Sequence, residues 1–112
     1  MRQDEDRLAD ILDAIENIER YSAKGKGAFE SEELVQVWMI HYLQVIGEAA
    51  RGTSAKLRNA FPLILWESII GFRNLAVHEY FRIDLSVVWE IVVQDIPILK
   101  AQIKEILTTL GS

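Results

Sequence analysis

The stretch "LADILDAIENIERY" (Leu8–Tyr21) decides the fold class. Its apolar residues recur at steps of three and four, which is the period of an α-helix with one buried face. The acidic residues just before it, from Asp4 to Asp6, suit the positive N-terminal end of a helix. The pattern therefore predicts an amphipathic helix over residues 4–22.

Four further helices, and no strand, are predicted from the rest of the chain. The glycines of "AKGKGAFES" should end the first helix, and "RGTSAKLRNA" (51–60) should be a polar, basic linker. The expected helices are one capped by Ser31 and ending near Ala50, one from Pro62 to Tyr80 or Phe81, one capped by Asp84 and ending near Gln94, and one starting near Pro97 after a break at "QDIP". We expect a single domain over residues 1–112, an all-α up-and-down bundle of four to five helices.

The composition of the chain limits its class. Half of its 112 residues are apolar and the mean hydropathy is +0.10, so we expect some apolar surface to be buried against another subunit. No segment approaches the roughly 20 apolar residues of a membrane span, and the acidic start does not resemble a signal peptide. The chain has no cysteine, which excludes disulfides and thiolate metal sites. We expect a soluble, cytoplasmic protein.

The net charge of −5 weighs against a protein that binds nucleic acid through its overall charge. A local basic patch is still open: two loops carry Arg51, Lys56 and Arg58 and also Lys24 and Lys26, and they would rim a phosphate site if they met. More often such loops are simply solvated. Histidines and carboxylates show no metal-ligand spacing, so we expect no metal and no cofactor.

The stretch "RNLAVHEY" (73–80) concentrates polar side chains near the end of an apolar helix. A histidine can move a proton near neutral pH, and an arginine can hold a phosphate with two hydrogen bonds. RNA supplies its own nucleophile, the 2′-OH, so Arg73 and His78 would suffice for phosphodiester cleavage without a metal. Five residues apart, they diverge by about 140° on an ideal helix. Either the long arginine reaches round, or a two-fold dimer interface completes the site.

A structural role explains the same residues and is favoured when they are considered alone. Asn74 and His78 lie four apart and share a helix face, where they could form a buried hydrogen bond. Arg73 could then pair with Glu67 or Glu79.

Glu48 is the other candidate for the site. It follows Gly47, where two backbones can approach closely, and it could orient His78 or Arg73 from the neighbouring helix. A solvated carboxylate is the alternative. A lone histidine on an apolar helix, such as His41, is more often a core or interface residue than a ligand.

Four segments together resemble the HepT group of the HEPN superfamily. They are "DILDAIENIERY" (10–21), "VIGEAA" (45–50), "WESIIGFRNLAVHEYFRID" (66–84) and "VVWEIVVQDIPILKAQIKEIL" (87–107). The resemblance covers nearly the whole chain and implies a HEPN-like bundle that dimerises through the motif-bearing face, with paired Arg-x4-His motifs in the interface cleft. It further implies a toxin of a toxin–antitoxin pair that acts as a metal-independent endoribonuclease.

The resemblance also implies a role for each motif residue. His78 would transfer protons, Arg73 would bind phosphate and Asn74 would support them. Tyr80 would accept AMP from a minimal nucleotidyltransferase, the antitoxin partner that silences the toxin. The chain has His41-Tyr42 where many relatives have an Arg-Asn pair before the "IGEA" segment.

Two other functions remain open at this stage. In one, the chain is a non-catalytic binding subunit of a nucleotidyltransferase complex, and Tyr80 is only a modification substrate. In the other, it is a helical dimer in which Arg73 and His78 form hydrogen bonds at the interface.

Overall fold

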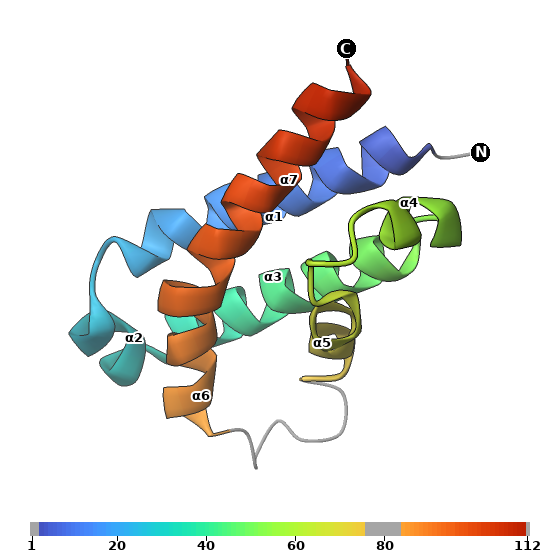
Figure 1. Cartoon of the computed structure of the whole chain (residues 1–112). Helices are drawn as coiled ribbons and strands as arrows, with labels where there is room; N and C mark the ends of the chain where they lie inside the picture. Colours follow the sequence, from blue (N-terminus) through green and yellow to red (C-terminus); the bar gives the residue numbers. More distant parts are fainter. Residues whose placement is uncertain (1–2, 76–83, 112) are drawn as a thin grey trace.

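A computed structural model describes residues 3–75 and 84–111, and every regular secondary-structure element in this part of the chain is a helix. The elements are α1 (Asp4–Ser22), α2 (Lys26–Ser31), α3 (Glu33–Arg51), α4 (Ala55–Ala60), α5 (Trp66–Gly71), the 3-10 turn η1 (Phe72–Asn74), α6 (Leu85–Glu90), the π-helical turn η2 (Ile91–Asp95) and α7 (Ile96–Leu110) (Figure 1). The all-α prediction is confirmed. No helix within the described residues is long and apolar enough to cross a bilayer.

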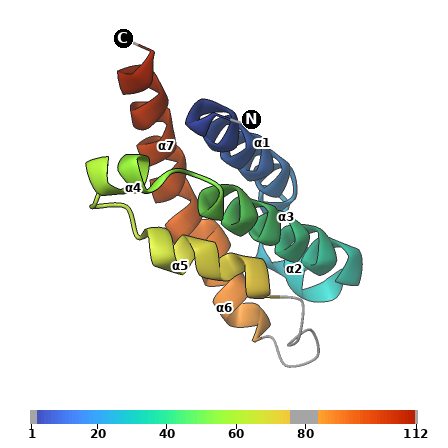
Figure 2. The same cartoon turned by 90° about the vertical axis from the view of Figure 1, so that its right-hand side faces the viewer.

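The core lies where α1 packs against α3 and α7, and α5 covers the end of α3 nearest α4 (Figures 1 and 2). The buried apolar residues of α1 are those of the predicted face: Leu8, Ile11, Ala14, Ile15 and Ile18. Facing them, α7 buries Leu99, Ile103 and Ile106. Burial of each Leu or Ile among them contributes roughly 1.5–3 kcal/mol, so this seam is a main source of the hydrophobic stabilisation.

Two segments predicted as loops contain short helices. The glycine-rich segment contains α2, which follows Gly25 at φ 91° and buries Phe29 against Trp89, with ring centroids 5.3 Å apart. The predicted linker contains α4, because the Ser54 hydroxyl accepts a hydrogen bond from the Leu57 N–H and Leu57 is buried. The cap predicted at Ser31 is also wrong: this residue ends α2, and Glu32 precedes α3.

The motif-bearing helix begins at Trp66 instead of Pro62. The Trp66 indole N–H donates to the carbonyl of Phe61 at 3.0 Å, which closes a turn over the intervening residues. The helix then tightens into η1. The end predicted at Tyr80 or Phe81 lies outside the described residues.

The break predicted at "QDIP" is wrong, because α6, η2 and α7 follow one another without a gap. A proline ring clashes with the carbonyl four residues earlier in an α-helix, and the wider π turn before Pro97 relieves that clash. The cap predicted at Asp84 is confirmed, since its Oδ1 accepts a hydrogen bond from the Ser86 N–H at 2.9 Å.

Candidate functional site

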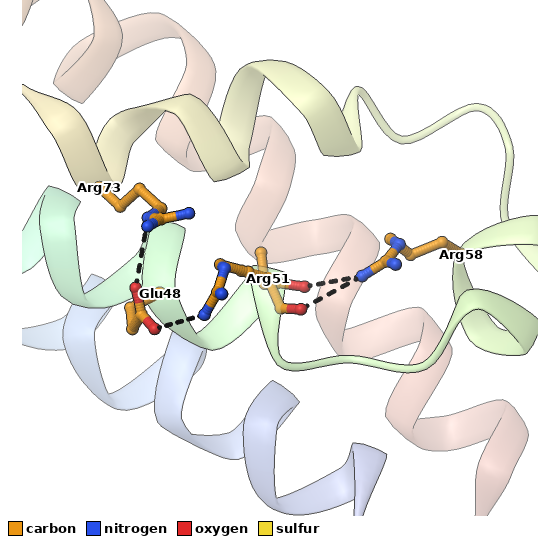
Figure 3. Close-up of polar contacts among 5 residues, drawn as sticks. Glu48, Arg51, Arg58 and Arg73 are labelled. Atoms are coloured by element: carbon orange, nitrogen blue, oxygen red, sulfur yellow. Dashed lines mark hydrogen bonds and ion pairs between the residues drawn. The ribbon is translucent and has the colours of Figure 1, made fainter.

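Arg73 lies in η1, directly against the C-terminal half of α3 (Figure 3). The approach is possible because α3 has a glycine there. A Cβ built on Gly47 would lie 2.5 Å from the backbone nitrogen of Arg73 and 3.0 Å from the carbonyl oxygens of Ile69 and Ile70. Only glycine fits this contact, since the neighbouring atoms are backbone atoms that cannot rotate away.

Two side chains of α3 hold Arg73 on either side of this contact. The Gln44 side-chain amide donates to the Arg73 carbonyl at 3.3 Å, and the Glu48 Oε2 lies 3.5 Å from the Arg73 Nε. Gln44, Gly47 and Glu48 are three and four residues apart, so they share one side of α3. Together they form a seat that fixes both the backbone and the side chain of Arg73.

Glu48 connects Arg73 to a second arginine. Its other oxygen, Oε1, lies 3.2 Å from Arg51 Nη1. Glu48 thus contacts Arg73, one of the two residues that it was expected to orient, and its side chain is at the same time 57% exposed. Ion pairs this exposed contribute about 0–1 kcal/mol to stability. The pair therefore matters more for the orientation of Arg73 than for the fold.

The Arg73 guanidinium retains donors for an anion. Glu48 approaches it through Nε, and within the described residues neither terminal nitrogen of Arg73 has a bonded partner. Those two nitrogens can bind two oxygens of one phosphate in parallel. The side chain is 38% exposed, so such a group can reach it from solvent. The predicted alternative pair with Glu67 does not form in the described part of the chain.

The other residues of the predicted site are only partly described. Asn74 ends η1, is exposed, and makes no side-chain hydrogen bond to any described residue. His78 and Tyr80 lie outside the described residues, as does Glu79. Their positions relative to Arg73, and the completion of the site across a dimer, stay predictions.

His41 is not a core residue, because its side chain is exposed in the chain. It packs edge-to-face on Tyr42, with ring centroids 4.8 Å apart. The same outer side of α3 exposes Leu34 to 83% and Val37 to 40%. This outer face of α3, defined by Leu34, Val37 and His41, is apolar and has no covering element within the described residues.

The two basic loops do not meet. Lys24 lines a hollow with the first residues of α3, whereas Arg51 ends that helix, whose 19 residues span about 28 Å. The predicted five-residue patch is therefore wrong. Arg51 and Arg58 do lie close together at the far end, where Arg58 donates to the Arg51 carbonyl at 3.4 Å (Figure 3).

Sequence reasoning missed Gln44 as part of the site. The available signal was its spacing of three and four residues from Gly47 and Glu48. Within residues 3–75 and 84–111, no three histidine, aspartate or glutamate side chains are grouped to hold a metal ion. The described site is thus an arginine whose backbone and Nε are held by α3 and whose two terminal nitrogens can bind an anion.

Comparison with known proteins identifies this class. A family model described as Ribonuclease HepT-like matches residues 11–106. A protein of Thermococcus cleftensis named "Probable ribonuclease HepT" is 32% identical over 94% of this chain and 96% of its own length. A Methanocaldococcus jannaschii protein named "Putative RNase MJ1380" is 31% identical over 87% of this chain and 90% of its own. No solved structure matches significantly. The chain belongs to the HepT-like ribonuclease family, as its motifs predicted.

Proposed function

We propose that the chain is the toxin of a toxin–antitoxin pair, a metal-independent endoribonuclease that cleaves RNA by attack of the 2′-OH. The observation that carries the proposal is the seat on α3, which holds Arg73 by its backbone and by Nε while both terminal nitrogens face no described partner. The family match to ribonucleases supplies the substrate class.

The reaction needs one phosphate-binding group and two proton transfers. Arg73 binds the non-bridging oxygens and balances the charge that grows on them as the phosphorus becomes five-coordinate. His78 takes the proton of the 2′-OH, the O2′–P bond forms and the P–O5′ bond breaks. A protonated group, for which we propose His78 of a second copy, gives its proton to the leaving O5′. The products are a 2′,3′-cyclic phosphate and a 5′-OH, and Asn74 supports the histidine.

A homodimer that buries the outer face of α3 would bring two such sites together. That face is apolar over the N-terminal half of α3. Further along the same side of the helix lies Glu48, which contacts Arg73. Burial of Leu34 and Val37 by a partner would remove exposed apolar surface from water, which favours association.

Control by a minimal nucleotidyltransferase antitoxin fits the place of Tyr80 in the sequence, two residues after His78. Transfer of AMP from ATP to the tyrosine oxygen would release pyrophosphate and place a phosphodiester two residues from His78. The added negative charge would compete with RNA for Arg73, and the nucleoside would fill the site. AMP on Tyr80 would therefore block cleavage by occupying the phosphate-binding group.

The test is cleavage of a mixed RNA pool in EDTA by the free, unmodified protein, beside Arg73→Ala and His78→Ala. We expect the wild type to cleave and both variants to lose activity while keeping the wild-type oligomeric state and melting temperature. Absence of cleavage by unmodified, dimeric wild type would refute the nuclease and leave the alternative, a binding subunit of a nucleotidyltransferase complex.

A further inference from the structure

Within the described residues, four arginines gather around the C-terminal end of α3, in a protein whose net charge is −5. They come from four different elements: Arg7 from α1, Arg51 from α3, Arg58 from α4 and Arg73 from η1. The proposed reaction uses only Arg73. The other three need a separate explanation.

Arg58 is fixed in place without being neutralised. Its Nη1 donates to the Thr53 carbonyl at 2.8 Å and lies 3.4 Å from the carbonyls of Ala50 and Arg51. Ala50 and Arg51 are the last two residues of α3, and the carbonyl groups at the C-terminal end of a helix attract cations. All these contacts use one nitrogen, and no carboxylate in the described part of the chain pairs with this guanidinium. Its Nη2 and Nε therefore remain available for an anion.

Arg7 adds positive charge at the same turn. Its guanidinium lies over Gly52, where a Cβ would be only 2.7 Å from the arginine Cζ, and its buried Nε has no hydrogen-bond partner among residues 3–75 and 84–111. Asp4, on the same helix as Arg7, accepts two hydrogen bonds from Ser54: Oδ1 accepts from the backbone N–H at 2.8 Å, and Oδ2 accepts from the hydroxyl at 2.7 Å. Asp4 is thus already engaged in joining α1 to α4.

Arg51 links this turn to Arg73. The Glu48 carboxylate lies between the two guanidinium groups, with one oxygen 3.2 Å from Arg51 and the other 3.5 Å from Arg73. The two arginines are therefore neighbours on the surface. Figure 3 shows Arg73, Glu48, Arg51 and Arg58 following one another along the end of α3. Two guanidinium groups thus share one carboxylate, so Arg73, Arg51 and Glu48 together carry a net positive charge.

Capping of α3 accounts for Arg58 but not for Arg51. The Arg51 side chain is 55% exposed and, among the described residues, its side chain bonds only to Glu48. An exposed arginine with one shared acid gains little stability from that pair. It is, however, well placed to bind a second phosphate beside the one at Arg73.

We propose that Arg73, Arg51 and Arg58 form an arginine row on which the backbone of single-stranded RNA lies. Arg73 would bind the phosphate that is cleaved, and Arg51 and Arg58 would bind the next two phosphates of the strand in the direction of α4. The inference rests on the proposed ribonuclease function and adds the path that the substrate strand takes over the protein surface. A row of fixed cations along one helix end suits an extended strand and explains how an acidic protein binds RNA locally.

The test measures the salt dependence of binding to a short single-stranded RNA whose 2′ oxygens are all methylated, which prevents attack by the 2′-OH. Each phosphate contact contributes about 0.7 to the slope of log K against log salt for single strands. We expect Arg51→Gln to lower the slope by about 0.7 and to weaken binding about three- to tenfold at low salt. Arg51→Lys should keep the slope. Lys26→Gln, an exposed cation at the other end of α3, should change neither.

Arg58→Gln should lower the slope by a similar amount, with its melting temperature measured to exclude unfolding. If that variant does not fold, Arg51→Gln and Arg51→Lys decide the matter alone. A wild-type slope for Arg51→Gln would refute the row. If Arg51→Gln keeps the wild-type slope, but wild type cleaves unmodified RNA and His78→Ala does not, the arginine row is refuted and the proposed ribonuclease activity stands. Reduced slopes with no cleavage would support the row and refute the nuclease.

Discussion

Gly47 is the residue whose replacement tests the Arg73 seat most sharply. In Gly47→Ala the new methyl carbon would lie 2.5 Å from the Arg73 nitrogen, whereas ordinary contact begins at 3.4 Å. The α5–η1 segment must therefore retreat from α3 by about 0.9 Å, because the opposing atoms are backbone. Overpacking of this kind costs about 1–3 kcal/mol, and the better helix propensity of alanine returns about 1 kcal/mol.

The net effect on stability is therefore small, at about 0–2 kcal/mol, and we expect the melting temperature to fall by a few degrees. The effect on catalysis is larger. A displacement of about 1 Å in a positioning group can cost about 100-fold in rate. Because Gln44 and Glu48 hold Arg73 at fixed lengths, the same retreat stretches both contacts. We expect kcat/KM for RNA cleavage to fall about 100-fold.

The assay is cleavage of a fluorogenic RNA, with calorimetry on the same samples. Gly71→Ala is the matched control: it adds a methyl to α5 itself, where no described atom outside its own stretch of helix backbone lies within 4 Å, and should leave the rate unchanged. Wild-type kcat/KM for Gly47→Ala would refute the seat. An equal loss in Gly71→Ala would show that the helix backbone, and not the contact at Gly47, is responsible.

Three further outcomes follow from the described contacts. Glu48→Gln should bind the methylated RNA about threefold more tightly, because Arg51 and Arg73 lose the carboxylate that they share. Its kcat should fall, because Glu48 also orients Arg73. Weaker binding by this variant would contradict the reasoning. The pKa of Asp84 is lowered, first by the hydrogen bond from the Ser86 hydroxyl and then by the one from the Ser86 N–H. The carboxylate of this cap therefore stabilises the fold fully above the ordinary pKa of 3.8, and that stabilisation is lost as the pH falls through the lowered pKa. In acid, the melting temperature of Asp84→Asn should change less with pH than that of the wild type. Leu34→Asp should dissociate the proposed dimer in light scattering, whereas Leu63→Asp, 89% exposed elsewhere, should not; a dimer in both would contradict an interface on the outer face of α3.

The long helices were predictable because their apolar pattern repeats over several turns. The predicted bounds of α1 match the observed Asp4–Ser22. By contrast, α2 and α4 have six residues each and one buried apolar side chain apiece, too few to show a period. The π turn before Pro97 was also missed, since a proline in sequence signals a break, whereas here a wider turn accommodates it.

The site was predictable only where the signal was local. Glu48 could be connected to Arg73 because Gly47 permits close backbone approach. Sequence alone could not show that the outer face of α3, instead of its other apolar sides, would be exposed, because α3 is apolar nearly all round. The meeting of Arg7 and Arg58 at the end of α3 depends on the packing of α1 and α4, which no spacing in the sequence encodes.

Analysis of the RNA ends left by the wild-type protein in EDTA, beside His78→Ala, tests the central claim most directly. Attack by the 2′-OH with protons moved by His78 predicts 2′,3′-cyclic phosphate and 5′-OH ends from the wild type and no cleavage by the variant. Ends carrying 3′-OH and 5′-phosphate, or undiminished cleavage by His78→Ala, would contradict it.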